Sequence, residues 1–403
     1  MTSKSSSYRW IILALLFAGT TINYLDRIIL GVLLPEIEKE MVISPMLYGF
    51  IIGSFQFTYT IGLLGAGWVI DKLGTKLGYF MSIVLWSLSG AAHGLCRSAW
   101  SFAGWRAVFG LSAAGNFPAA IKTVSEWFNV KDRAFATSLF NSGSSISSII
   151  GAPLALAIVL QVGWRWTFVV FGAAGFVLAL FWMLLYKKPQ FDKKMKSDAV
   201  PWRVLLQQKQ TWGIMIGKAL TDPVWWFYLF WTPKYFLDAR GLNIRGMALA
   251  IPAIYALATL MGFVGGWLPK YFLSKGWSVE RARKTTMLFS ASLLPISAMA
   301  VFANEMWLVV VLISLACGGH NSWSANIFTM CSDCFESHSV GSVTGIAGFA
   351  GGVGSIFISA AVPAILVEYF GYVPVFLLMG FLHPLAFLFV KNLVSYKNEG
   401  ALS

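Results

Sequence analysis

The chain has 403 residues, of which 57% are hydrophobic and only 12% charged, and its net charge is +13. A soluble chain usually carries about 25% charged residues, so this composition excludes a soluble globular protein and makes a lipid bilayer the solvent for most of its surface. The positive charge does not indicate nucleic-acid binding, because the Lys and Arg residues lie in short loops between apolar runs and not on one face of a folded domain.

Apolar runs long enough for the roughly 20 residues of a membrane-crossing helix recur twelve times along the chain. They fall at 10–34, 47–70, 77–96, 98–121, 134–160, 165–187, 211–237, 247–273, 284–304, 306–330, 340–367 and 372–393. A polar, basic stretch separates the two sets of six. We therefore predict an all-α membrane protein with an N-terminal six-helix bundle (1–187), a linker (188–210) and a C-terminal six-helix bundle (211–403), the plan of many secondary transporters.

The loops also indicate an orientation. Most of the 30 Lys and Arg residues lie in the two termini, the linker and alternate loops. Because basic loops are retained on the cytoplasmic side, we expect the linker and both termini to face the cytoplasm. Four basic residues remain inside the apolar runs, namely Arg27, Arg106, Lys218 and Lys234.

The first run contains TINYLDRIIL (21–30), in which Asp26 precedes Arg27. Each such charge costs roughly 2.5–3.5 kcal/mol at the bilayer centre, so a passive anchor would lack both. Arg106 in the fourth run lies at a depth similar to that of Arg27, at ~10–12 Å below the outer surface for a rise of 1.5 Å per residue. Two guanidinium groups at one depth suit bidentate binding of a carboxylate. The alternative is that each arginine is a structural partner of Asp26 or of a backbone carbonyl.

Two acidic residues inside the runs are candidates for proton coupling. Uptake of an anion against an inside-negative potential costs ~2.3 kcal/mol per charge per 100 mV, so accumulation needs a cotransported cation. Asp26 lies beside the predicted anion site, and its proton can respond to occupancy of that site. Asp222 in the seventh run precedes Pro223, which favours a hinge. Lys218 lies four residues earlier on the same helix face, so Asp222 is alternatively half of a structural ion pair.

The stretch GWVIDKLGTK (67–76) joins the second and third runs. Gly67 allows close helix approach, Asp71 can meet a helix N-terminus or a base, and Gly74 permits a tight turn. The stretch resembles the G-x-x-x-D-x-x-G-x-[KR] loop of the major facilitator superfamily, in which it acts as a gating loop. At the corresponding place in the second half, Lys270 stands where the acid would be.

Further stretches narrow the resemblance to the anion:cation symporter family, and within it to bacterial hexuronate transporters, with D-galactonate transporters as relatives. They are NYLDR (23–27), SEWFNVKDRA (125–134), FNSGSSI (140–146), LTDPVWWFYLFWTPKY (220–235), GWSVERARK (276–284) and VGSVTG (340–345). The resemblance implies that Arg27 and Arg106 bind substrate, that Asp26 couples protons, and that Tyr24 and Tyr59 contact the sugar. One departure is Ala113, where many members have a glutamate.

The tenth run carries the polar sequence HNSWSAN (320–326). An aromatic plane can pack on the C–H face of a sugar and an amide can satisfy its hydroxyls, so Ser322, Trp323 and Asn326 are predicted C-terminal substrate contacts. The alternative is packing between helices, a common role of polar residues in membrane spans.

Together these features predict a proton symporter that imports a hexuronate such as glucuronate or galacturonate by alternating access. We expect a multi-pass monomer in the bacterial inner membrane, surrounded by lipid, with no cofactor, metal or nucleic-acid partner. An enzyme is not expected, because the sequence has no phosphate-binding G-x-x-x-x-G-K-[ST] motif and no cluster with metal-ligand spacing. The alternatives are a transporter of another sugar acid, such as the aldonate galactonate, an uncoupled or exchange transporter, and a non-transporting sugar-acid receptor.

Overall fold

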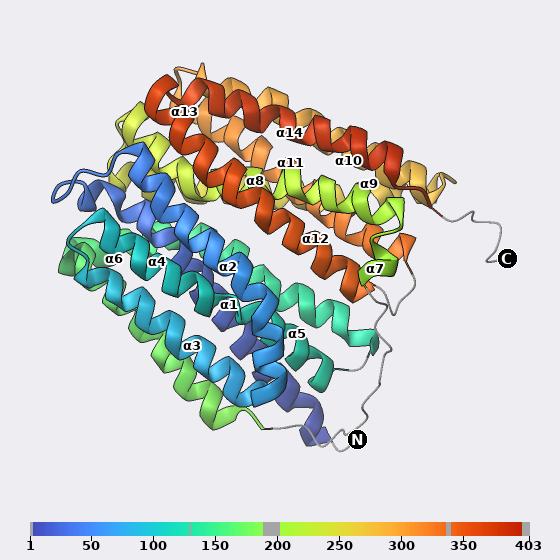
Figure 1. Ribbon diagram of the computed structural model, residues 1–403, viewed down its shortest axis with the longest axis horizontal. Coiled ribbons are helices and arrows are strands. Elements are labelled where there is room, and N and C mark those ends of the chain that lie inside the picture. The colour runs from blue at the N-terminus through green and yellow to red at the C-terminus, as the bar shows by residue number, and fades with distance from the viewer. Residues whose placement is uncertain (1–2, 129, 188–201, 336–339, 397–403) are drawn as a thin grey trace. The chain divides into compact units, whose positions relative to one another are not determined.

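The computed structural model describes residues 3–128, 130–187, 202–335 and 340–396, and the ordered elements in these ranges are all helices (Figure 1). The chain divides into two compact units. The first unit comprises Met1–Lys194 and Pro233–Pro252, and the second comprises Met195–Thr232 and Ala253–Ser403. Two long helices, α8 (Lys209–Arg240) and α9 (Ile244–Ser274), each contribute residues to both units.

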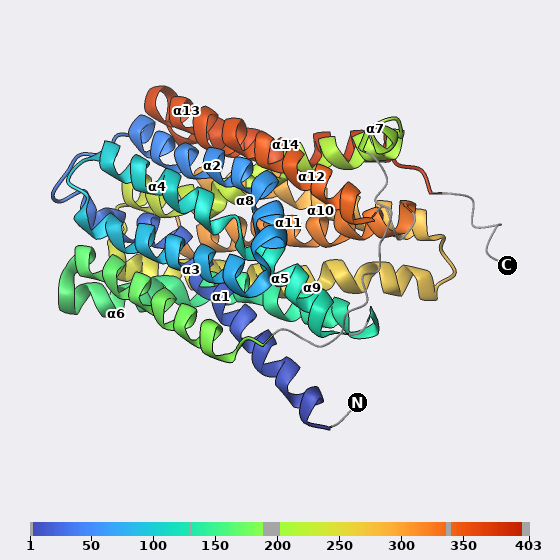
Figure 2. The same ribbon diagram turned by 60° about the horizontal axis from the view of Figure 1, so that its bottom comes forward.

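Helices of the N-terminal part build most of the first unit. They are α1 (Ser3–Ile37), α2 (Pro45–Leu73), α3 (Thr75–Ala92), η1 (His93–Leu95), α4 (Ala99–Ala113), α5 (Asn116–Trp127) and α6 (Val130–Leu185). Helix α1 packs along α6, α2 packs along α4, and α3 lies beside α6 in both ribbon views (Figures 1 and 2). Gly163 has φ 77°, and it bends α6 between the fifth and sixth predicted spans.

The second unit contains parts of α8 and α9 and all the elements that follow them. These are α10 (Val279–Ala298), η2 (Met299–Val301), α11 (Met306–Cys334), α12 (Val340–Ser355), the π-helical turn η3 (Ile356–Ala361), α13 (Val362–Phe370) and α14 (Tyr372–Leu393), with the short α7 (Trp202–Leu205) before them. Helix α10 packs against α11 and α14. The wide turn η3 precedes Pro363, whose ring removes a backbone donor and disturbs the regular helix there.

Within the described residues, eight helical segments are long and apolar enough to cross a membrane. Helix α8, which carries Lys218, Asp222 and Lys234, is not among them. The run predicted at 98–121 is not one helix, since α4 ends at Ala113 and α5 begins at Asn116. Gly115 at this break packs against the Ser82 hydroxyl, and Pro118 cannot donate a backbone hydrogen bond to a continuous helix.

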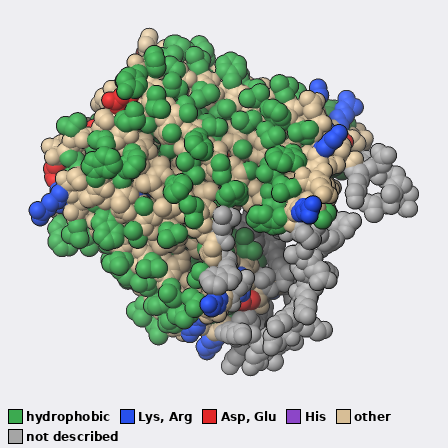
Figure 3. All heavy atoms as spheres, viewed as in Figure 1, with side chains coloured by type: hydrophobic (Ala, Val, Ile, Leu, Met, Phe, Trp, Pro, Cys, Tyr) green, Lys and Arg blue, Asp and Glu red, His purple; other side chains and the backbone are tan. Residues whose placement is uncertain are grey.

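The surface and the helix ends fit this membrane setting. On the face shown in Figure 3, hydrophobic side chains cover the middle, and charged side chains lie toward the edges. Side chains cap helix starts, since the Ser44 hydroxyl accepts from the Leu47 amide and Ser98 forms a capping box with Ser101. The exposed apolar side chains thus suit a lipid environment, and these helix starts are satisfied by local polar groups.

In the second unit, Gly354 on α12 sets a close contact with α8. A Cβ at Gly354 would overlap the backbone carbonyl of Ala219, whereas a Cβ at Gly345 on the same helix would meet nothing within 4 Å. Small residues of this kind let membrane helices approach backbone to backbone.

We predict that Gly354→Ala lowers the apparent melting temperature in detergent, because overpacking a tight contact costs about 1–3 kcal/mol. Gly345→Ala is the matched control, and it should leave the melting temperature unchanged or slightly higher, since alanine favours a helix over glycine by about 1 kcal/mol. Intrinsic tryptophan fluorescence during heating measures both. Equal melting curves for the two variants would contradict the close contact.

Candidate functional site

Arg27 is the centre of the candidate site in the first unit. It lies on α1 and is fully buried, and both its Nε and its Nη2 donate to the side-chain oxygen of Asn23, at 3.0 and 2.7 Å. Its guanidinium carbon lies 4.3 Å from the ring centre of Tyr24 and 4.5 Å from that of Tyr59. The amide oxygen of Asn23 and the rings of Tyr24 and Tyr59 thus help to hold the guanidinium in position.

Aromatic stacking holds this arrangement across three helices. Tyr59 stacks on Phe55 with ring centres 5.5 Å apart, and Phe55 stacks on Phe109 of α4 at the same distance. Each cation–π contact contributes about 0.5–2 kcal/mol, depending on how far the cation is desolvated. The structure thus brings together Tyr24, Arg27 and Tyr59, three of the residues predicted to bind substrate, on α1 and α2.

Arg106 lies at the same level as Arg27 but bonds to the backbone of α1. Its Nη1 donates to the carbonyls of Asp26 and Arg27, at 3.3 and 3.2 Å. Its Nε and Nη2 are buried and have no hydrogen-bond partner among the described residues. Nη1 therefore has the predicted structural role, a bond to backbone carbonyls, and the anion-binding role of Arg106 stays a prediction.

Asp26 is the acidic group of the same cluster. Its carboxyl group interacts electrostatically with Arg106, and it packs against α3, where a Cβ at Gly90 would lie 3.5 Å from the carboxyl oxygen. One carboxyl oxygen of Asp26 is buried without a hydrogen-bond partner among the described residues. A buried polar atom without a partner costs free energy.

Asp222 in the second unit forms the ion pair that its spacing predicts. Lys218 Nζ lies 2.8 Å from a carboxyl oxygen of Asp222 and 4.1 Å from the ring centre of Phe328. A Cβ at Gly351 of α12 would overlap the Asp222 carboxylate, so the pair is packed between α8 and α12. The pair is electrically neutral, and the predicted proton role of Asp222 stays a prediction.

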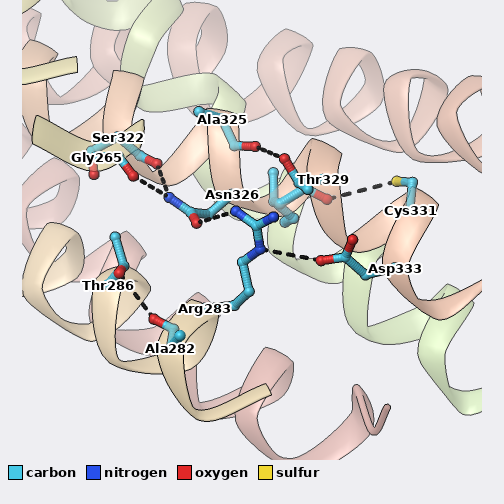
Figure 4. Close-up of polar contacts among 11 residues, drawn as sticks. Gly265, Ala282, Arg283, Thr286, Ser322, Ala325, Asn326, Thr329, Cys331 and Asp333 are labelled. Carbon is cyan, nitrogen blue, oxygen red and sulfur yellow. Dashed lines mark hydrogen bonds and ion pairs between the residues drawn. The ribbon is translucent and has the colours of Figure 1, made fainter. Parts of the chain in front are cut away.

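Asn326 makes hydrogen bonds to three helices of the second unit (Figure 4). Its amide nitrogen donates to the carbonyls of Gly265 and Ser322, at 3.1 and 2.8 Å, and its oxygen accepts from Arg283 at 3.3 Å. Arg283 also pairs with Asp333 at 3.1 Å. The side chain of Asn326 therefore connects α11 with α9 and α10.

Ser322 and Trp323 are buried in the same region. The Ser322 hydroxyl shares a hydrogen bond with the hydroxyl of Ser290 on α10, and Trp323 is fully buried. In this conformation Ser322 and Asn326 bond to residues of α9, α10 and α11, whereas the buried indole nitrogen of Trp323 has no hydrogen-bond partner among the described residues. Their substrate role stays a prediction.

The predicted gating loop is described only in part. Gly74 ends α2 and begins α3 with φ 79°, a conformation that glycine adopts without strain. Gly67 and Asp71 lie on α2 at positions whose side-chain surroundings are outside the described residues. Gly74 therefore has the turn geometry that its place in the motif predicts.

Two features of the first unit were not predicted from the sequence. Asn23 positions Arg27, although its spacing of four residues was a readable signal. Lys234 is buried, and its Nζ pairs with Glu38 at 3.1 Å and Asp238 at 3.2 Å and donates to the Ile43 carbonyl at 3.3 Å. The contact with Glu38 joins residues far apart in the chain, which no local spacing could reveal.

Comparison with solved structures identifies the fold. A D-xylose–proton symporter aligns with a TM-score of 0.75 at 15% identity, covering 96% of this chain and 98% of its own. A bacterial homologue of the human lysosomal transporter Spinster, in an inward-facing unoccupied conformation, aligns with a TM-score of 0.72 at 16% identity, covering 95% of both chains. The chain thus has the fold of these membrane transporters.

The family follows from the sequence comparison. A family model described as Major Facilitator Superfamily matches residues 16–275, and the chain belongs to this superfamily. It is therefore a multi-pass membrane transporter and not an enzyme, with the predicted all-α fold.

Its curated relatives are sugar-acid transporters. The hexuronate transporter of Escherichia coli (strain K12) is 29% identical over 393 residues, covering 93% of this chain and 91% of its own. The galacturonate transporter of Dickeya chrysanthemi is 32% identical over 289 residues, covering 67% of this chain and 84% of its own. The D-galactonate transporter of Escherichia coli O6:H1 is 26% identical over 401 residues, covering 92% of both. These findings confirm the resemblance seen in the sequence.

We predict that Asn23→Ala destabilises the first unit, because a hydrogen bond to a charged group is worth about 1.5–3 kcal/mol and Arg27 would lose two of them. The apparent melting temperature should fall, and the control Asn141→Ala, at an exposed position on α6, should not change it. If the two variants melted alike, Asn23 would not be a support of Arg27.

Proposed function

We propose that the protein imports a hexuronate, glucuronate or galacturonate, together with protons across the bacterial inner membrane. The observation that supports this most is the buried guanidinium of Arg27, held by Asn23 and by the rings of Tyr24 and Tyr59. A buried cation of this kind attracts an anion, and the curated relatives carry sugar acids by name.

Each part of the site matches one part of a hexuronate. The planar guanidinium fork of Arg27 suits the carboxylate, and its burial strengthens the interaction because water does not screen it. The phenols of Tyr24 and Tyr59 are only half-buried, and each offers a sugar hydroxyl both a donor and an acceptor. Arg106 has two nitrogens that supply further donors at the same level.

Asp26 is the proposed proton carrier of this site. It shares the field of Arg106 with the bound anion, so neutralisation of the arginines by substrate favours a proton on Asp26. Asp222, paired with Lys218, is the second proposed proton carrier. Import of a proton with each carboxylate removes the cost of ~2.3 kcal/mol per 100 mV that an anion alone would meet.

The remaining parts of the proposal concern the transport cycle. Two six-helix bundles (1–187 and 211–403), joined by the linker 188–210, alternate their access to the two sides, with both termini in the cytoplasm. The loop with Gly67, Asp71 and Gly74 gates the cytoplasmic side, and Ser322, Trp323 and Asn326 contact the sugar when their helices rearrange. The transporter works as a monomer surrounded by lipid.

A second candidate function is exchange of sugar acids without a net proton flux, including aldonates such as galactonate. It is favoured by Ala113, which is fully buried on α4 and cannot carry a proton. A D-galactonate transporter is among the relatives. Uptake driven by an imposed pH gradient separates the two functions, because an exchanger does not accumulate substrate under it.

We predict that Arg27→Lys reduces galacturonate uptake into proteoliposomes at least about 10-fold, although the charge is kept, because lysine cannot bind bidentately or stack between two rings. Arg97→Lys, at an exposed position, is the matched control and should transport normally. Normal transport by Arg27→Lys would remove this guanidinium from the substrate site.

We predict that Asp26→Asn abolishes accumulation driven by a pH gradient but keeps counterflow between internal and external galacturonate. Asparagine preserves the shape of the side chain and removes only its proton chemistry. Asp222→Asn, measured in parallel, shows whether the second carboxyl group is also needed. Full pH-driven accumulation by Asp26→Asn would assign coupling to another group.

A further inference from the structure

One buried lysine in the first unit is shared by two carboxylates. The Nζ of Lys234 on α8 lies 3.1 Å from Glu38, just beyond the end of α1, and 3.2 Å from Asp238, one turn further along α8. The same Nζ donates to the carbonyl of Ile43 at 3.3 Å, and the lysine side chain is 2% exposed. The cluster thus has one cation and two anions, which leaves one net negative charge when all three side chains are ionised. The candidate site does not use these residues.

This cluster joins the ends of two long helices to the connection between α1 and α2. The segment Pro233–Pro252, the end of α8 and the start of α9, belongs to the first unit, whereas the rest of both helices belongs to the second. A proline bounds the segment on each side, and proline weakens a helix because it removes one backbone hydrogen bond. The contacts of Lys234 with Glu38 and Ile43 hold the segment to the first unit. The two prolines are therefore points at which it can bend away.

Glu38 is a carboxyl group of this cluster that solvent reaches, since its side chain is 24% exposed. Burial raises the pKa of Glu38, the charge and hydrogen bond of Lys234 lower it, and Asp238 raises it again, so that the pKa of Glu38 lies above its usual value. Further titratable groups nearby are Tyr48 on α2 and the ion pair of Glu36 with Lys39.

A proton on Glu38 and the contact with Lys234 favour each other. When Glu38 is ionised, two carboxylates share one ammonium, and their repulsion opposes the contact. When Glu38 is protonated, Lys234 and Asp238 form a neutral pair on α8. If the segment bends away, Glu38 returns to water and to its usual pKa. The contact is therefore strengthened as the pH falls from the raised pKa to the usual one, and it does not depend on pH above or below this window.

We propose that Glu38, Lys234 and Asp238 form a proton-binding site on the outer surface, which holds the segment Pro233–Pro252 to the α1–α2 connection when the exterior is acidic. This inference rests on the proposed function, whose orientation places Glu38 outside and whose alternating access supplies the open state. The proton enters from the outer solution and returns to it, so the number of protons carried across the membrane is unchanged. An acidic exterior thus drives uptake and also closes the outer side after loading.

A distance measurement between two spin labels tests this site without any sugar. Val42, next to the cluster, is 89% exposed, and Leu249, in the segment, is 79% exposed, so both positions accept a label. Double electron–electron resonance on the full chain in lipid nanodiscs gives the closed fraction, the molecules whose labels have the separation of this structure. The ratio of closed to open molecules should rise as the pH falls, by at most about 10-fold per pH unit, the limit for one proton. The four native cysteines are buried, and the chain without introduced cysteines is the labelling control.

Three substitutions distinguish this site from a contact that is only structural. Glu38→Gln should keep the closed fraction high at every pH, because glutamine is neutral, as protonated Glu38 is. Asp238→Asn should weaken the pH dependence, since Lys234 then pairs with Glu38 alone. Glu36→Gln is the matched control, because Glu36 pairs with Lys39 close by, and it should keep the wild-type dependence. A closed fraction that is constant with pH in the wild type, or the wild-type dependence in Glu38→Gln or Asp238→Asn, would overturn the proposal.

Transport into proteoliposomes separates this proposal from the proposed function. Under an imposed pH gradient, Glu38→Gln should reach the same final accumulation of galacturonate as the wild type, because Glu38 carries no proton across the membrane. A lower final accumulation would make Glu38 a carrier of transported protons and would refute its role as an outer site. A wild-type protein that carries no sugar acid, but whose closed fraction changes with pH as expected, would refute the proposed function alone.

Discussion

The burial of the Arg27 guanidinium inside the membrane is the constraint on which the candidate site depends. A cation in this position is costly and needs compensation from its surroundings. Asn23 supplies an oxygen, and Tyr24 and Tyr59 supply ring faces, but none of the three removes the positive charge. The aromatic stack of Tyr59, Phe55 and Phe109 joins α2 and α4, and the contact of Tyr59 with Arg27 links it to α1. The substrate carboxylate proposed above would add an opposite charge beside this guanidinium.

Helix geometry made part of this site readable from the sequence. The rise per residue placed Arg27 and Arg106 at one depth, and the spacing of four residues predicted the Lys218–Asp222 pair, which the structure contains. Depth does not give the direction of a side chain around its helix. Arg106 approaches the backbone of α1, whereas Arg27 lies among the rings of Tyr24 and Tyr59. That difference depends on how α1, α2 and α4 pack, which no single helix encodes.

Long-range packing also explains what the sequence left open elsewhere. The sequence HNSWSAN is visibly polar, but it does not indicate which groups Asn326 bonds to. Two of its hydrogen-bond partners, Gly265 and Arg283, lie on other helices. The twelve apolar runs predict the helices but not the break between α4 and α5, where Gly115 lies against Ser82 of another helix and Pro118 lacks a backbone donor. Periodicity and composition therefore predict the elements, and tertiary contacts decide which polar groups remain available to a ligand.

The charges near the candidate site give the proposed coupling a physical order. Arg27, Arg106 and an ionised Asp26 sum to one positive charge, so a proton on Asp26 before substrate would leave two positive charges buried together. A bound monovalent hexuronate cancels one of these two charges. With substrate bound, protonation of Asp26 therefore leaves the site with one net positive charge, the same as the empty site with Asp26 ionised. Anion and proton thus favour each other's binding through the field of the arginines, and by linkage this effect is reciprocal. The Lys218–Asp222 pair has no such excess charge, so a proton on Asp222 would leave the buried Lys218 cation without its partner.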